Sequence, residues 1–437
     1  MQASAVKVLI LIALGATALG ASLVAKTSAL YTYILLYVLV FLLFKPKYLI
    51  SPQTIIHSYY FVFFIIAPLF AGIHREDDFS SFDFHLAFSM IFLTHTTAAF
   101  GSHLGHRWTG KKTIAPKVQE MPSHKGLLLE TKIAFFYLTS SILVYAIIQS
   151  SGGILYWFEA PGDAFLNRAG SGIYVVLSHL STFILAGLVG FSSYRSGQKS
   201  GMIVFLFWLA ITSPVHGSKQ LIAIFLAISL APWIRSVKLV SLAAIIFSAA
   251  LIGVFFFGLY LRNVSWMTLE DALPYALNYF TTLRNLMILL EDFDPGFMQT
   301  FFLPFNKFLT PFGLSDPRLY FDMNHMLTDI YFPSAWEIRA TEQWPVEADL
   351  YLNFYFIFGL PVIFLYTFLL GAVNGRSQSR PNLGICVVST ILVFSIVSHL
   401  RGSIYNHVDF YLYPMLFLIY LALRSYPLPF KASTKTT

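Results

Sequence analysis

The sequence has few charged residues and almost no cysteine. Asp, Glu, Lys and Arg make up only 11% of its 437 residues, whereas a soluble globular domain carries about 25%. Hydrophobic residues account for 57%. This balance excludes an ordinary soluble domain and indicates an integral membrane protein. With Cys386 as the single cysteine, intramolecular disulfides are excluded, and cysteine usage does not reveal the compartment.

Several motifs of soluble enzymes are also missing. The sequence contains no Gly-rich nucleotide-binding loop, no nucleophile elbow and no catalytic Cys/His pair. His103 and His106 are one helical turn apart, but no carboxylate ligand stands near them. We therefore predict no metal ion and no cofactor, and a soluble nucleotide-sugar transferase is unsupported.

Long apolar segments are what the chain does have. A membrane-spanning helix needs about 20 mostly apolar residues. We predict an all-α polytopic membrane protein with about 12 transmembrane helices, and we interpret the first as a retained helix rather than a signal peptide. The predicted spans are 5–25, 30–44, 52–73, 84–101, 130–150, 173–191, 201–213, 219–234, 238–260, 350–372, 383–400 and 408–424.

The basic residues set the predicted orientation. With the N-terminus in the cytoplasm, 18 of the 28 Lys and Arg residues lie in cytoplasmic segments, including the basic loop 102–129. This excess follows the positive-inside rule and places both termini in the cytoplasm. Lysines beside anionic lipid headgroups explain the net charge of +7. We therefore predict membrane lipids as partners and no nucleic acid.

The opposite face carries a long segment without a span. Residues 261–349 hold 12 of the 21 acidic residues, and we predict that they form a large periplasmic loop with short helices. The chain then divides into about nine helices in 1–260, the loop 261–349, and about three helices with a short cytoplasmic tail in 350–437. Seven of the ten outer cations are arginine. The guanidinium group matches pairs of phosphate oxygens and always stays charged.

Four of the outer cations are candidate ligands for a substrate. "SPVHGSKQ" (213–220) places Lys219 at a tight turn, where it is either a phosphate ligand or a snorkelling lysine. "HLRGSIYNHVDFY" (399–411) brings His399 and Arg401 to a connection between two spans. Arg284 lies on the face of a predicted helix (268–293) together with apolar residues, which favours contact with protein or a ligand cavity over lipid. Arg339 follows in the same loop.

Two carboxylates stand at the mouth of a predicted span. In "WPVEADLYLNFYFIFGLP" (344–361), Glu347 and Tyr351 are four residues apart and share a helix face, and Asp349 follows close behind Glu347. A carboxylate in a partly desolvated site has a raised pKa and can accept a proton. Capping of the helix N-terminus by acids is the alternative explanation, worth a few tenths to about 1 kcal/mol.

These stretches resemble the motifs of bacterial O-antigen polymerases, the oligosaccharide repeat-unit polymerases of the Wzy type. "HGSKQLIAIFLAISL" is similar to the family's Gly-Ser-Arg turn that opens a helix, with Lys219 in place of the arginine. "WPVEADLYLNFYFIFGLP" resembles the string that closes the family's periplasmic loop, with looser spacing. "HLRGSIYNHVDF" resembles the Arg-Gly segment before the last span. The three motifs surround one long loop in the family's order.

The resemblance implies a membrane glycosyltransferase of the C-type superfamily in the bacterial inner membrane. It would polymerise repeat units carried on undecaprenyl pyrophosphate at the periplasmic face, without a metal ion, and a chain-length regulator protein is a further partner. The expected catalytic residues are Glu347 as the base, with Asp349 as the second candidate for that role, and Arg401, which would stabilise the leaving pyrophosphate. The expected substrate-binding residues are Lys219, Arg284, Arg339, Arg401, Tyr351 and His399. An O-antigen ligase and a lipid-linked oligosaccharide flippase are the alternatives.

Overall fold

The computed structural model describes residues 2–70, 79–110, 124–166, 172–216, 219–235, 280–310, 319–337, 341–379 and 381–428, with shorter pieces between 237 and 277 and at 313–314. Helices form nearly all of the regular structure in these residues. Isolated β-bridges, among them Phe297 with Phe354 and Asn382 with Pro427, are the nearest approach to a sheet within these ranges. The predicted all-α class is thus confirmed.

Six described helical segments are long and apolar enough to cross a membrane. They are Val6–Val24, Pro52–Phe70, Leu128–Ser150, Gly172–Ser196, Ile357–Ser379 and Leu383–Leu400. Four apolar helices are shorter: Ala29–Leu43, Ser200–His216, Gln220–Ile234 and Asp409–Leu423. All ten overlap predicted spans, and α5 (Phe82–Gly110) overlaps another. Most of the predicted span 238–260 lies outside the described residues, so the number twelve stays a prediction.

The predicted span 350–372 differs from the structure in its boundaries. Residues Val346–Phe354 form a separate short helix, α18, and the next helix begins with a 3-10 turn at Ile357–Gly359 followed by α19 (Leu360–Ser379). Tyr355 and Phe356 end α18 because both have positive φ, 47° and 61°, a conformation that side chains with a Cβ rarely adopt. The apolar run conceals this break, since no Gly or Pro marks it.

Contacts divide the chain into two compact units. Unit 1 comprises 1–108, 248–372 and 395–410, and unit 2 comprises 109–247, 373–394 and 411–437. Each unit collects segments that are distant in sequence, so the units cut across the linear division into 1–260, 261–349 and 350–437. The assignment of those three parts to sides of a membrane stays a prediction.

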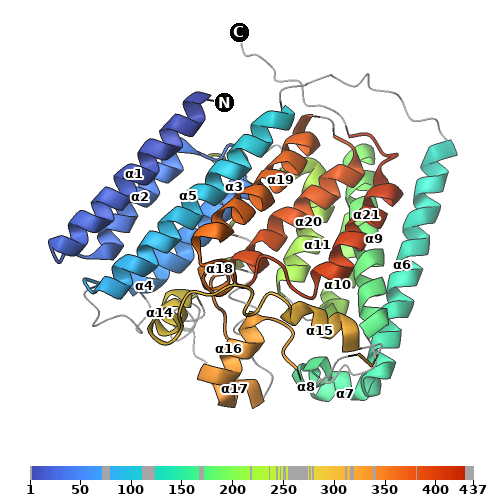
Figure 1. Ribbon diagram of the computed structural model, residues 1–437. Coiled ribbons are helices and arrows are strands. Elements are labelled where there is room, and N and C mark those ends of the chain that lie inside the picture. The colour runs from blue at the N-terminus through green and yellow to red at the C-terminus, as the bar shows by residue number, and fades with distance from the viewer. Residues whose placement is uncertain are drawn as a thin grey trace, which may run out of the picture. The chain divides into compact units, whose positions relative to one another are not determined.

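Unit 1 begins with α1 (Gln2–Val24) and α2 (Ala29–Leu43), which lie side by side (Figure 1). The third helix changes form along its length: α3 (Pro52–Phe61), a π-helical turn (Val62–Ile66) and α4 (Ala67–Phe70). Helix α5 follows. Short helices then come from the predicted loop: α14 (Thr282–Asp292), α15 (Leu303–Leu309), α16 (Met323–Tyr331) and α17 (Pro333–Glu337). The predicted short helices of 261–349 are thus present among the described residues.

Helix α5 packs closely on α19 within unit 1. A Cβ atom at Gly101 or Gly105 would collide with the backbone carbonyls of Phe364 and Phe368. Glycines four residues apart let two helix backbones approach in this way, which favours association inside a bilayer. The contact fixes the first turns of α19, directly after α18, against α5.

Unit 2 contains α6 (His124–Ser150), α7 (Gly153–Glu159), α8 (Pro161–Leu166), α9 (Gly172–Ser196), α10 (Ser200–His216) and α11 (Lys219–Ile234). Most of α20 (Leu383–Leu400) and α21 (Asp409–Leu423) also belong to it. Its core is apolar and includes the fully buried side chains of Leu185, Phe225, Val387 and Ile419. The predicted site residues in unit 2 are limited to Lys219.

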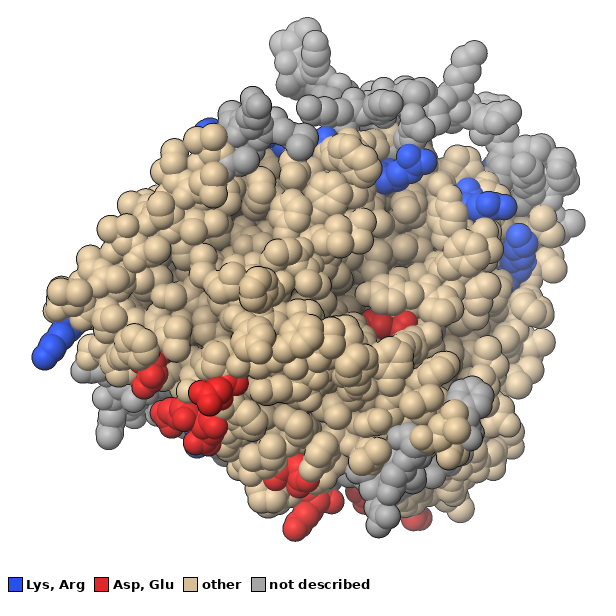
Figure 2. All heavy atoms as spheres, in the orientation of Figure 1, with Lys and Arg blue, Asp and Glu red and all other residues tan. Residues whose placement is uncertain are grey.

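The surface matches the low charge of the sequence. In the view of Figure 2 most surface atoms belong to residues that are neither acidic nor basic. Large apolar side chains such as Leu9, Leu35 and Phe358 are more than 60% exposed. Apolar exposure on this scale suits helices that face lipid.

Candidate functional site

The two carboxylates of the 344–361 motif lie in the first turn of α18 and are buried. Glu347 is completely inaccessible and Asp349 is 4% exposed. Helix α18 begins after Pro345, whose extended backbone (φ −74°, ψ 160°) turns the chain into the helix. The acids therefore stand where the helix dipole favours negative charge. Apolar neighbours on α18, among them Val346 and Leu350, are also buried, so the helix is enclosed on most sides.

Glu347 accepts a hydrogen bond from a buried tyrosine. The Tyr60 hydroxyl donates to Glu347 Oε1 at 2.9 Å. The other oxygen, Oε2, is buried and has no hydrogen-bond partner among the described residues. Burial raises the pKa of Glu347 to about 7, against the opposing influence of the nearby Tyr60 and Thr94 hydroxyls. The Thr94 hydroxyl donates a hydrogen bond to the carbonyl of Met90 at 2.9 Å. This carboxylate is therefore under-satisfied for a buried acid.

Asp349 is held by more donors. Asn353 Nδ2 donates to Oδ1 at 2.7 Å, and the backbone N–H of Ile404 donates to Oδ2 at 3.1 Å. Burial raises the pKa of Asp349 to about 6, although the hydrogen bonds from Ile404, Asn353 and Ser403 oppose this effect. Asn353 in turn accepts from the Thr300 N–H and donates to the Thr300 hydroxyl, both at 2.8 Å. Asp349 thereby fastens α18 to the segment that follows α20.

Arg401 lies directly after α20 and near Glu347. Its guanidinium carbon is 5.5 Å from the centroid of the Phe63 ring, in the π-helical turn that follows Tyr59 and Tyr60. The Tyr59 hydroxyl donates to the carbonyl of Leu400 at 2.6 Å. Both Glu347 and Arg401 are close enough to Tyr59 to act on it electrostatically. The structure therefore brings two predicted catalytic residues into the neighbourhood of one tyrosine, and single π-helical turns occur frequently at functional sites.

Helix α16 secures the backbone that carries Arg401. Asn324 Nδ2 donates to the Arg401 carbonyl at 3.3 Å. Asp322 lies 3.6 Å from His407 Nδ1 and 3.5 Å from His325 Nδ1. Burial opposes ionisation of Asp322, but its hydrogen bond with His407 and the charge of His325 lower its pKa overall. The connection between α20 and α21 is therefore held from both ends.

His399 belongs to a hydrogen-bonded series. Its Nε2 is 3.0 Å from Asp409 Oδ2, and its Nδ1 is 2.6 Å from the Tyr366 hydroxyl. Asp409 also accepts the backbone N–H of Asn406 at 2.9 Å. Asp409 lies at the start of α21, His399 at the end of α20 and Tyr366 in the second turn of α19. The series joins three helix ends within unit 1.

The other predicted site residues are not gathered around Glu347. Arg284 is exposed on α14, whose buried face carries Leu283, Leu286 and Leu289 instead; the predicted apolar face containing Arg284 is therefore not the buried one. Lys219 begins α11 in unit 2, and its side chain is outside the described part. Arg339 also lies outside the described residues. The Tyr351 hydroxyl donates to the carbonyl of Phe293 at 3.1 Å.

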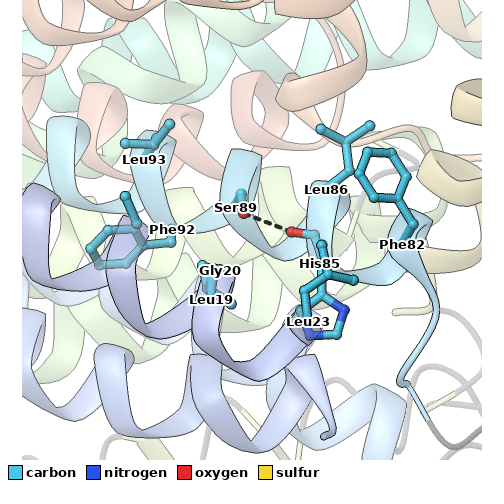
Figure 3. Close-up of a pocket in the computed structure, with 10 residues that line it drawn as sticks. Leu19, Gly20, Leu23, Phe82, His85, Leu86, Ser89, Phe92 and Leu93 are labelled. Atoms are coloured by element: carbon cyan, nitrogen blue, oxygen red, sulfur yellow. Dashed lines mark hydrogen bonds between the residues drawn. The ribbon is translucent and has the colours of Figure 1, made fainter. Parts of the chain in front are cut away.

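A mostly apolar cavity in unit 1 lies away from these residues. It measures about 250 Å³ between α1 and α5 and is lined by Leu19, Leu23, Leu86 and Phe92, among others (Figure 3). Its histidine, His85, is bonded to the Ser22 hydroxyl at 3.0 Å and the Ser81 carbonyl at 2.8 Å. The cavity contains none of the predicted site residues.

Sequence reasoning missed Tyr59, Tyr60 and Thr300. All three are buried or bonded at the site, yet each sits in an aromatic or apolar run. The tyrosine pair in "HSYYF" (57–61) was the available signal, since polar groups inside a predicted span usually face other protein groups. For metals, the described residues contain no group of three or more His, Cys, Asp and Glu side chains arranged to hold an ion.

Comparison of the chain with protein-family models, with curated proteins and with solved structures gives no match.

Proposed function

We propose that this protein polymerises lipid-linked oligosaccharide repeat units into O-antigen or a related surface polysaccharide at the periplasmic face of the bacterial inner membrane. The donor is a glycan on undecaprenyl pyrophosphate, and the acceptor is a fresh lipid-linked repeat unit. One observation carries the proposal: Glu347 and Arg401, 54 residues apart in the sequence, both lie close enough to Tyr59 to act on it electrostatically. An acid and a cation held together suit a reaction that both removes a proton and releases an anion.

The reaction is a substitution at the anomeric carbon of the donor sugar. A hydroxyl oxygen of the acceptor forms the new bond to that carbon, and the bond between the carbon and the pyrophosphate oxygen breaks. The bonding electron pair leaves with the pyrophosphate, and the hydroxyl proton passes to the base. No oxidant, reductant or further co-reactant is needed.

Glu347 suits the role of base. General base catalysis is most efficient when the pKa of the base lies near the working pH, and burial raises the pKa of Glu347 to about 7. Its Oε2 has no hydrogen-bond partner in the described part of the chain, so an acceptor hydroxyl would supply the missing donor. Because Glu347 is completely buried, the acceptor must displace neighbouring side chains to reach it.

Arg401 suits the role of anion stabiliser. A guanidinium group over an aromatic ring is held in orientation by cation–π attraction. The guanidinium carbon of Arg401 lies 5.5 Å from the centroid of the Phe63 ring. A preorganised cation at the place where negative charge develops is among the largest contributions to catalysis. Lys219, Arg284 and Arg339 stay predicted binding residues without a defined place in this site.

Asp349 has a different role in the proposal. Its donors from Asn353 and Ile404 are already present, so we assign it to positioning Glu347 and the Arg401 segment rather than to proton transfer. His399 takes a similar part through Asp409 and Tyr366. The site therefore consists of one base, one cation and a set of residues that fix their spacing.

Deletion of the gene followed by analysis of surface glycans tests the proposal. A polymerase deletion leaves lipopolysaccharide capped by a single repeat unit, and re-expression of the full chain restores long chains. An uncapped core would indicate an O-antigen ligase, and intermediates trapped on the cytoplasmic side would indicate a flippase. Unchanged glycans would remove the protein from this pathway.

A further inference from the structure

Aromatic side chains are exposed near the end of α18 and the start of α19. They belong to two segments, 297–308 and 355–358, and their exposed fractions range from 38% for Phe305 to 70% for Phe358. We call this set the aromatic collar; its members are Phe297, Phe302, Phe305, Phe308, Tyr355 and Phe358. Contiguous apolar surface of this kind is unusual on a face that meets water.

The aromatic collar is anchored at both of its segments. The rings of Phe297 and Tyr355 stack with centroids 6.4 Å apart, and Phe297 pairs with Phe354 in a β-bridge. The backbone N–H of Gly296 donates to the Tyr351 carbonyl at 2.9 Å. At the other end, the Phe305 ring lies 5.2 Å from that of Phe410. The exposed aromatics are therefore presented by fixed backbone.

The collar continues the apolar surface of a membrane-type helix. Phe358 belongs to the candidate span Ile357–Ser379, and Leu365 farther along that helix is 56% exposed. Phe410, against which Phe305 packs, lies in the first turn of α21. The hydrogen bonds of His399 with Tyr366 and Asp409 bring the starts of α19 and α21 together with the end of α20. The collar thus lies beside the meeting point of these three helix ends.

We infer that the aromatic collar is inserted into the interfacial region of the bilayer and that phospholipid covers it. Aromatic rings concentrate at the level of the lipid headgroups, where an apolar body and a polar edge are both accommodated. Lys307, exposed between Phe305 and Phe308 on α15, adds a cation that suits lipid phosphate. Residues 296–308 are then a membrane-bound part of the predicted loop 261–349, not a water-exposed one.

The collar is bonded to the candidate site. Thr300, within the collar segment, holds Asn353, and Asn353 donates to Asp349. The Tyr405 hydroxyl donates to the carbonyl of Phe301, which joins the collar to the segment after Arg401. The carboxylates consequently lie close to headgroup depth, where a ligand carried on a lipid can approach from within the bilayer. The insertion itself does not depend on the proposed function.

Site-directed fluorescence in proteoliposomes tests the insertion. Cys386, the single cysteine, is replaced by Cys386→Ser, and Phe302→Cys and Phe308→Cys are labelled separately with an environment-sensitive nitrobenzoxadiazole probe. Labels in the collar should show blue-shifted emission, quenching by phospholipids with a nitroxide near the headgroup, and loss of quenching by aqueous iodide. Leu365→Cys on α19 is the membrane control, and Ser334→Cys, exposed on α17, is the aqueous control.

Labels at 302 and 308 that behave like the label at 334 would overturn the inference. If one variant does not remain monodisperse in detergent, Phe305→Cys replaces it, so that two collar positions are always read. The measurement needs no turnover and no glycan substrate. A failed insertion therefore leaves the proposed function standing, and a failed glycan assay leaves the insertion standing.

Discussion

Two carboxylates two residues apart on α18 meet very different surroundings. Both are buried, and burial raises the pKa of each. Asp349 receives hydrogen bonds from Asn353 and from the Ile404 backbone, whereas Glu347 receives one from Tyr60 and keeps Oε2 without a partner in the described residues. The comparison separates a carboxylate whose hydrogen bonds hold α18 in place from one that the proposed function assigns to chemistry, and burial alone does not distinguish the two.

The largest expected effect is on glycan chain length. Glu347→Gln removes the base, and Arg401→Ala removes the cation near the leaving group. We expect either change to lower polymerisation roughly 100-fold or more, because a positioned base or a preorganised charge each contributes at least that much. The measurement is the ladder of surface glycans after complementation of the deletion strain, with membrane protein levels matched.

Charge-matched controls sharpen this test. Glu130→Gln changes an exposed acid on α6, and Arg376→Ala changes a cation in the last turn of α19. Both residues belong to unit 2, whereas Glu347 and Arg401 belong to unit 1, so both variants should retain long chains. Long chains in the Glu347 and Arg401 variants as well would exclude the proposed roles.

The second effect is on stability. Here we expect the change at Asp349 to have a larger effect than the change at Glu347. Asp349→Ala leaves the Ile404 N–H without its acceptor and removes one of the two acceptors of the Asn353 amide nitrogen, and each unsatisfied buried group costs about 1–3 kcal/mol. Glu347→Gln keeps an acceptor oxygen for Tyr60 and should cost less. Thermal unfolding of the purified protein in detergent compares the two variants. Equal melting temperatures would show that the hydrogen bonds of Asp349 do not stabilise the fold.

The sequence predicted the helices well because their signal is local. A run of apolar residues long enough to cross a bilayer identifies itself, and the described helices overlap eleven of the predicted spans. It failed at the break between α18 and α19. The positive φ angles of Tyr355 and Phe356 are enforced by contacts such as the Phe356 N–H bond to the Leu350 carbonyl at 2.8 Å, and neither residue type signals such a turn.

The candidate site was predictable only in part. Glu347, Asp349 and Arg401 are charged residues in an apolar chain, so their positions alone drew attention. Tyr60 could be paired with Glu347 only in three dimensions, since 287 residues separate them. For Arg284, the sequence predicted the wrong face of a helix. Its predicted helix face included residues before 280 that are largely outside the described part, and α14 buries a different face.

The two acids also predict how stability changes with pH. Burial raises the pKa of Glu347 from 4.5 to about 7 and that of Asp349 from 3.8 to about 6. For each acid, the lower pKa applies to the unfolded chain and the higher pKa to the folded protein. Between the two, the folded protein keeps a proton that the unfolded chain has lost, so stability falls as pH rises from about 4 to 7. Below this window both states are protonated, and above it the loss is complete. Glu347→Gln should flatten the part of the curve nearest neutrality.

Activity should change in the opposite direction over the same range. The base must be deprotonated, so polymerisation should rise with pH and reach half its maximum near pH 7. Tyr60→Phe removes the hydrogen bond from the tyrosine hydroxyl to Oε1, and that bond favours the charged carboxylate. The pKa of Glu347 should therefore rise further, and the midpoint of activity should move to higher pH with little loss at the plateau.

Glycan synthesis by proteoliposomes across pH 5–9 measures the shift. Tyr37→Phe is the matched tyrosine control, because the Tyr37 hydroxyl donates to the His57 carbonyl. A midpoint that stays in place would show that Glu347 does not set the pH dependence, and a plateau that collapses would assign Tyr60 to structure instead.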